Sequence, residues 1–96
     1  GAVPEIEINA LVVLLNALIR EKISHGDLEG HNILWHQQRC YLIDLDAMQQ
    51  HQRMGSFARA YMKDRTRLLR NWPQQSPLYK LLDQRLPQLP SSCPED

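Results

Sequence analysis

The chain has 96 residues, enough for one domain with a modest core. Its 11 Lys and Arg balance 11 Asp and Glu, so the total charge gives no reason to expect a nucleic-acid partner. Apolar residues make up 43% of the chain, which excludes whole-chain disorder and fibrous repeats. Two cysteines, Cys40 and Cys93, are too few for a disulfide scaffold or a four-cysteine zinc site, so a reducing, cytoplasmic setting fits best.

The first predicted element is a helix from about Pro4 to Lys22. Pro4 suits the first helical turn, and Glu5 and Glu7 suit the positive end of the helix dipole. Apolar positions surround most of this helix, so we expect it to be covered on several sides. Its apolar run from Ala10 to Ile19 is too short for a membrane span, which needs about 20 apolar residues.

A loop with two glycines and two acids covers Ser24 to Gly30. Two short β-prone runs follow, Ile33 to Trp35 and Tyr41 to Ile43. The polar residues 36–40 between these runs predict a β-hairpin with a loop of a few residues.

The second half of the chain has a helical apolar period. Ser56 is the predicted cap of a helix that Pro73 ends, and Ser76 with Pro77 predicts the start of a short helix. The Pro- and Ser-rich residues 87–96 predict a disordered tail. The long helix is expected to turn five large apolar residues inward: Phe57, Tyr61, Leu68, Leu69 and Trp72.

Three oxygen-bearing side chains stand at the ends of the predicted hairpin. Asp27 and Asn32 lie five residues apart across one loop, and the hairpin returns the chain so that Asp44 can lie beside Asn32. Carboxylate and amide oxygens suit hard cations such as Mg²⁺, which is commonly shared with substrate phosphates. The spacing therefore predicts a cation site at the open end of the hairpin.

The strings HGDLEGHNILW and YLIDLD resemble the catalytic and metal-binding loops of protein-kinase-like phosphotransferases. That pattern is His-x-Asp, an Asn five residues after the Asp, a hairpin, and an Asp on a D-F-G-type turn. The His-Gly-Asp form is more similar to small-molecule kinases, such as aminoglycoside and choline phosphotransferases, than to protein kinases. With LIDLDAMQQHQ and a basic helix ending in RTRLLRNW, the chain most resembles the bacterial lipopolysaccharide core (Kdo/heptose) kinase family, over roughly residues 6–72.

The resemblance implies a role for each matched residue. Asp27 would accept the proton of the attacking hydroxyl or orient it, while Asn32 and Asp44 would hold Mg²⁺ against the phosphates of ATP. His25 would hold the catalytic loop by hydrogen bonds. Two positions depart from the pattern. Asp46 replaces the Gly of D-F-G, and it would be either a second metal contact or a residue that shapes the loop. Glu29 occupies the position where protein kinases often have a phosphate-contacting Lys.

The fold that the resemblance implies is α+β and mostly helical, the C-terminal lobe of a protein-kinase-like fold over residues 1–86. The glycine-rich loop and strand-borne lysine of such kinases belong upstream of the catalytic loop, and residues 1–24 match neither. We therefore expect a fragment whose N-terminal lobe is missing and which does not turn over ATP alone. The preferred function of the parent is phosphorylation of a lipopolysaccharide-core sugar hydroxyl. Other kinase acceptors, such as an aminoglycoside or a protein Ser, and a silent pseudokinase binding module remain as alternatives.

Residues 53–70 form the strongest local charge feature. They carry six Lys or Arg and one acid, Asp64, for a formal charge of +5. One interpretation is that this helix attracts an anionic sugar or lipid-linked sugar acceptor, or contacts the inner membrane at its periphery. The other is a solvated helix face. Asp64 lies nearer the apolar stripe than its basic neighbours, so we expect it to be buried and paired with an arginine.

Overall fold

The structure, a computed structural model, describes residues 5–90. It is α+β and mostly helical, as the sequence predicts. Three α-helices carry two small antiparallel two-stranded sheets and two short 3₁₀ helices. In chain order the elements are α1 (Glu5–Glu21), β1 (Ile23–Ser24), η1 (Gly30–Asn32), β2 (Ile33–His36), β3 (Arg39–Leu42), η2 (Leu45–Ala47), β4 (Gln49–Gln50), α2 (Met54–Leu69) and α3 (Pro77–Arg85).

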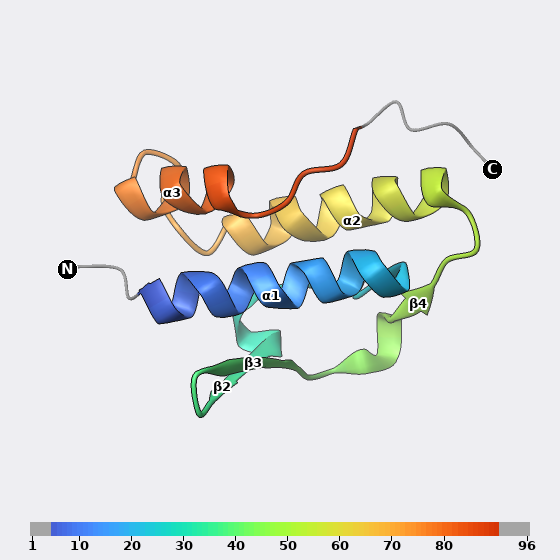
Figure 1. The fold of residues 1–96 in the computed structure, drawn as a ribbon, viewed down its shortest axis with the longest axis horizontal. Helices are drawn as coiled ribbons and strands as arrows, with labels where there is room; N and C mark the ends of the chain where they lie inside the picture. The colour runs from blue at the N-terminus through green and yellow to red at the C-terminus, as the bar shows by residue number, and fades with distance from the viewer. Residues whose placement is uncertain (1–4, 91–96) are drawn as a thin grey trace.

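Helix α1 lies between the α2–α3 pair and the β2–β3 hairpin, and α1 and α2 run in opposite directions (Figure 1). All three helices contribute to a single core, which also includes Leu28 of the loop between β1 and η1 and Ile33 of β2. Burying each large apolar side chain of this core contributes about 1.5–3 kcal/mol to folding. The buried stripe of α1 consists of Ile8, Leu11, Leu15 and Leu18.

The expected cover on several sides of α1 is found in part within residues 5–90. The α2–α3 pair lies on one side of the helix and the β2–β3 hairpin on another (Figure 1), and Val12, Leu14 and Ile19 are partly buried against the core. Ile6 is 51% exposed and Val13 is 67% exposed, so one face of the helix is left to solvent.

The predicted hairpin is present, with a tighter turn than expected. Ile33 pairs with Leu42 and His36 pairs with Arg39, so the loop is reduced to Gln37 and Gln38. Both loop residues have positive φ, 51° and 67°. A two-residue turn with positive φ at both positions matches the right-handed twist of the flanking strands. Residues 36, 39 and 40, which were expected in the loop, therefore pair within the strands.

The start of α2 differs from the prediction. The helix begins at Met54, and its N-cap Arg53 makes no side-chain capping bond. Ser56 instead hydrogen-bonds through Oγ to His51 Nδ1 at 2.9 Å, and His51 Nε2 lies 2.8 Å from Ser24 Oγ. Ser56 therefore ties the start of α2 to β1 and does not cap the helix.

The end of α2 lies at Leu69, ahead of the predicted stop at Pro73. Four of the five residues expected to point inward are buried, and Trp72, which follows the helix, is half-buried. Helix α3 begins as predicted, because the Tyr79 backbone N–H donates to Ser76 Oγ at 3.1 Å and Pro77 occupies the first turn.

A buried arginine joins α2 to α3. Arg65 is 4% exposed, and its guanidinium donates to Asp83 Oδ1 at 2.9 Å and to the Asp83 and Leu86 carbonyls. Its Nε donates to the carbonyl of Pro87, so the first residues of the predicted tail contact α2. Residues 91–96 of that tail lie outside the described residues. Across residues 5–90, no helix has the length and apolar character needed to cross a membrane.

The hairpin turn yields a stability prediction. Gln38→Gly should raise the free energy of unfolding by about 0.5–1 kcal/mol, because glycine adopts the positive φ without the cost that a side chain imposes there. Urea denaturation followed by circular dichroism measures the change. Ala17→Gly, inside α1, is the control with the opposite sign and should lower the free energy of unfolding by about 1 kcal/mol. A loss of stability in Gln38→Gly would contradict the turn geometry.

Candidate active site

The loop between β1 and η1 brings Asp27 and Asn32 into contact. The Asn32 side chain is 2% exposed, and its Nδ2 donates to the Asp27 carbonyl at 2.8 Å and to Asp27 Oδ2 at 3.2 Å. Both contacts use the amide nitrogen, so the amide oxygen of Asn32 is the end that can accept a cation. The spacing of five residues thus places a carboxylate and an amide together, as the sequence predicts.

His25 connects this loop to the segment that precedes Asp44. Its ring is fully buried, and Nε2 lies 3.0 Å from the Ile43 carbonyl, to which it donates. Its Nδ1 accepts a hydrogen bond of 3.2 Å from the Asp27 backbone N–H. One donor and one acceptor nitrogen define a neutral ring protonated on Nε2. His25 therefore holds both loops by hydrogen bonds, in agreement with the role inferred from the resemblance.

Asp64 of α2 fixes the backbone of the same loop. Its carboxylate is 3% exposed and accepts hydrogen bonds from the backbone N–H groups of His25 at 2.7 Å and Gly26 at 3.0 Å. Burial raises the pKa of Asp64 above its ordinary value, and the two N–H donors partly offset this effect. The predicted burial is therefore correct, and the hydrogen-bond partners are backbone amides rather than an arginine.

Gly26 adopts a conformation that side chains disfavour. Its φ is 88°, and a Cβ added there would lie 2.8 Å from both Cβ and the carbonyl oxygen of Ala47. The glycine of the His-Gly-Asp string is therefore required by the close approach of η2. This contact joins the catalytic loop to the segment after Asp44 at a second point.

Asp44 is positioned by backbone pairing. The Ile43 N–H donates to the Asn32 carbonyl at 2.9 Å, which extends the hairpin to its open end and places Asp44 next in the chain. Asp44 has a left-handed backbone, with φ of 57° and ψ of 70°, and turns the chain into η2. Asp44 and Asp46 are both exposed. No hydrogen bond or ion pair joins the Asp44 carboxylate to Asn32 or Asp27 among the contacts of the described residues.

Sequence reasoning missed Arg67, which reaches the catalytic loop from α2. Its Nη1 lies 3.6 Å from Asp27 Oδ1 and 3.4 Å from Glu29 Oε1. Glu29 also pairs with His31, at 3.2 Å through the other carboxylate oxygen. The only available signal was helical spacing, because Arg67 follows Asp64 by three residues and so lies on the same side of α2.

Asp27, Glu29 and His31 form a second group of possible cation ligands. One ligand atom from each lies within 4.8 Å of the others, and in the described part of the chain they are the one set of three such side chains. Exposed acids often cluster without binding metal, and Arg67 already pairs with two members of this group. Arg67 thus already balances charge on both carboxylates of this group.

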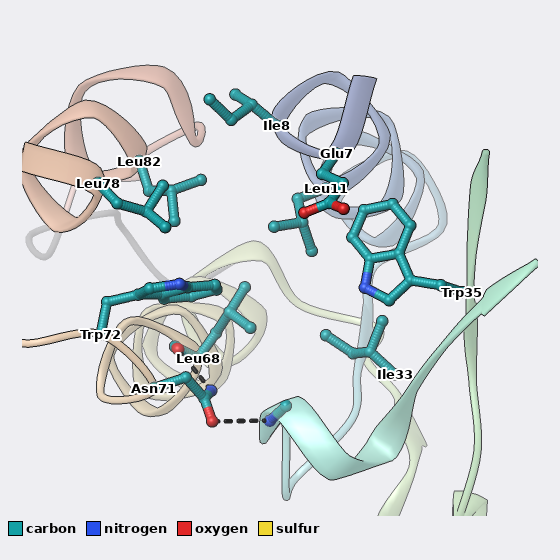
Figure 2. A pocket seen from close by; sticks show the side chains of 11 residues that line it. Glu7, Ile8, Leu11, Ile33, Trp35, Leu68, Asn71, Trp72, Leu78 and Leu82 are labelled. Atoms are coloured by element: carbon teal, nitrogen blue, oxygen red, sulfur yellow. Dashed lines mark hydrogen bonds between the residues drawn. The ribbon is translucent and has the colours of Figure 1, made fainter. Parts of the chain in front are cut away.

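An apolar cavity of about 190 Å³ lies behind the catalytic loop. Figure 2 shows Trp35 of β2 and Trp72 after α2 on opposite sides of the cavity, with leucines of α1, α2 and α3 around it. Asn71 closes its edge, accepting a hydrogen bond of 3.2 Å from the Gly30 N–H. None of the three predicted site residues lines this cavity, so it supports the loop and is not the site itself.

A profile of the lipopolysaccharide kinase (Kdo/WaaP) family matches residues 1–82. The match covers most of the chain, and the chain belongs to this family, as the catalytic and metal-loop strings indicate. No curated protein and no solved structure matches the chain significantly.

Membership of a kinase family implies ATP and a divalent cation in general terms. The residues present fit that requirement. The amide nitrogen of Asn32 donates to Asp27, so its amide oxygen is the atom that would bind a cation. Asp44 follows Ile43, which pairs with Asn32 at the same end of the hairpin. This all-oxygen donor set suits a hard cation rather than zinc.

The buried Asp64 carboxylate gives a direct test of how the loop is held. Asp64→Asn should lower the free energy of unfolding by about 2–3 kcal/mol, because the amide loses the charge and turns one N–H group toward a backbone donor. Urea denaturation measures this change, and hydrogen exchange should show lost protection at the His25 and Gly26 amides. Asp46→Asn, at an exposed acid, is the control and should stay within about 0.5 kcal/mol. Equal effects of the two variants would contradict the assigned hydrogen bonds.

Proposed function

We propose that the chain is the C-terminal lobe of a kinase that transfers the γ-phosphoryl group of ATP to a sugar hydroxyl of the lipopolysaccharide core. The observation that carries the proposal is the Asp27–Asn32 contact, held by His25 and Asp64 at the junction of the two loops. A carboxylate held by an amide nitrogen, with the oxygen of the same amide left to bind a cation, supports a site that orients a hydroxyl next to a bound cation.

Asp27 is the proposed general base. A sugar hydroxyl beside its carboxylate would lose its proton to Asp27 as the oxygen bonds to the γ-phosphorus and ADP leaves with the electrons of the broken P–O bond. The Asp27 carboxylate is half-buried and is oriented by the amide of Asn32. His25 is a positioning residue, because its neutral ring contacts the Asp27 backbone and not the carboxylate.

Asn32 and Asp44 are the residues that would hold the divalent cation, for which we propose Mg²⁺. When bound, such a cation neutralises charge on the phosphates of ATP and helps to align them. The supporting observation is that the hairpin closes at its open end through the Ile43–Asn32 hydrogen bond, which brings the two ligand positions to one edge. The remaining contacts to the nucleotide are assigned to the N-terminal lobe of the parent kinase.

The proposed partners are ATP and a core sugar, free or lipid-linked. We place the reaction in the cytoplasm, with the protein at the periphery of the inner membrane when the sugar is lipid-linked. The basic residues of α2 support this placement, since they favour anionic partners. We propose catalysis for a complete kinase in which this chain would be the C-terminal lobe.

A pseudokinase is the second candidate, and one observation favours it. Arg67 pairs with Asp27 Oδ1 and Asn32 donates to Oδ2, so each oxygen of the carboxylate already has a partner within the chain. In that case the same fold would bind a partner without transferring phosphate. The two candidates differ in whether Asp27 is needed for turnover.

In the complete kinase, Asp27→Asn should reduce kcat about 10²–10⁴-fold and leave the Kd for ATP nearly unchanged, because the base acts in the transfer step. Steady-state assays with ATP and a core oligosaccharide, together with calorimetric titration of the nucleotide, measure both quantities. Gln50→Glu, at an exposed position of β4, is a control for a change of one charge. Unchanged turnover in Asp27→Asn would reject Asp27 as the base.

Cation binding can be tested on the 96-residue chain itself with Mn²⁺, which broadens the NMR signals of nearby amides. Broadening should centre on residues 32 and 44, and Asp44→Ala should weaken Mn²⁺ binding about tenfold, since it removes the only charged ligand. Glu21→Ala, at an exposed acid at the end of α1, is the matched control and should keep the affinity. Broadening centred on Glu29 and His31 would assign the cation to the other acidic group and contradict the proposal.

A further inference from the structure

A hollow lined by basic side chains lies on α2, on the side from which Arg67 reaches Asp27. Its volume is about 320 Å³. Its lining residues recur every three or four positions along one side of the helix: Arg59, Met62, Lys63, Thr66, Arg67 and Arg70. Among residues 5–90, the side chains that line the hollow include four Lys or Arg and no acid, so it concentrates positive charge at one place.

Arg67 is shared between this hollow and the catalytic loop. Both of its ion pairs, with Asp27 and Glu29, use the single nitrogen Nη1. A guanidinium carries five N–H donors, so Nε and Nη2 remain to bind an anion from the hollow. The side chain is 40% exposed, which leaves it accessible to a ligand.

The two oxygens of Asp27 contact different partners. Oδ2 accepts from the amide nitrogen of Asn32, and Oδ1 lies 3.6 Å from Nη1 of Arg67, which also lines the hollow. Arg67 therefore links the hollow to the carboxylate of the proposed base.

We infer that the α2 hollow is the binding site for an anionic group of the acceptor, a phosphate or a carboxylate carried by the sugar. This inference rests on the proposed function, because it adds the charge of the acceptor and the residues that recognise it. Arg67 would bind the anion and place the sugar beside the base. Lys63, Thr66 and Arg70 would complete the site with charge and one hydroxyl donor.

Titration of the 96-residue chain with soluble sugars tests this site without ATP or turnover. Glucose 6-phosphate and galacturonate, one phosphate and one carboxylate, should each shift the amide NMR signals of residues 59–70 saturably. Neutral glucose should not. The double variant Lys63→Gln, Arg70→Gln should bind the anionic sugars about tenfold more weakly, since each lost cation removes a charge-assisted contact.

The control variant Lys80→Gln removes an exposed charge from α3, outside the hollow, and should bind as the parent does. Three results would overturn the inference: equal shifts with glucose, equal weakening in the control, or no response to either anionic sugar. Binding to anionic phospholipid vesicles without a response to the sugars would assign the basic stripe to a membrane surface instead. Because the assay needs no catalysis, its result can contradict the anion site in the hollow without bearing on the proposed role of Asp27 as the base.

Discussion

The position of the catalytic loop depends on one buried carboxylate. Asp64 is carried by a helix nearly forty residues downstream, yet it accepts hydrogen bonds from two consecutive backbone amides, at His25 and Gly26. Those hydrogen bonds fix the backbone of the loop that carries Asp27 and leads to Asn32. The ring of His25 then carries the constraint to Ile43, next to Asp44. Burying the Asp64 carboxylate costs free energy, and the hydrogen bonds from the His25 and Gly26 N–H groups offset that cost.

Helix α2 combines a structural and an electrostatic role. Its buried side contributes Phe57, Tyr61 and Leu68 to the core, and Arg65 fixes α3. Its C-terminal half faces the catalytic loop, where Asp64 holds the backbone and Arg67 lies beside the carboxylate of Asp27. Arg67 thus brings a positive charge from α2 to the two acids of the loop, Asp27 and Glu29.

The sequence separation between two contacting residues decides whether their contact could be predicted. The Asp27–Asn32 contact spans five residues and the hairpin spans ten, so local spacing was enough to predict both. Ser56 was misjudged as a cap because its true partner, His51, competes with the backbone for its hydroxyl. The contacts of Asp64 and Arg67 with the loop cross 38 to 40 residues. Helical periodicity indicates which side of α2 these residues occupy but not which loop packs there.

The three-residue interval between Asp64 and Arg67 has a consequence for how this chain tolerates change. A single helical turn holds the loop and supplies its counter-charge, so an insertion or deletion between these positions would rotate one of them away by about 100°. At the tip of the hairpin, by contrast, Gln37 and Gln38 are exposed and lie at the opposite end of β2 and β3 from Asn32 and Ile43. Length variation, peptide tags and fused reporters are therefore better accommodated at that tip than anywhere within the central turns of α2.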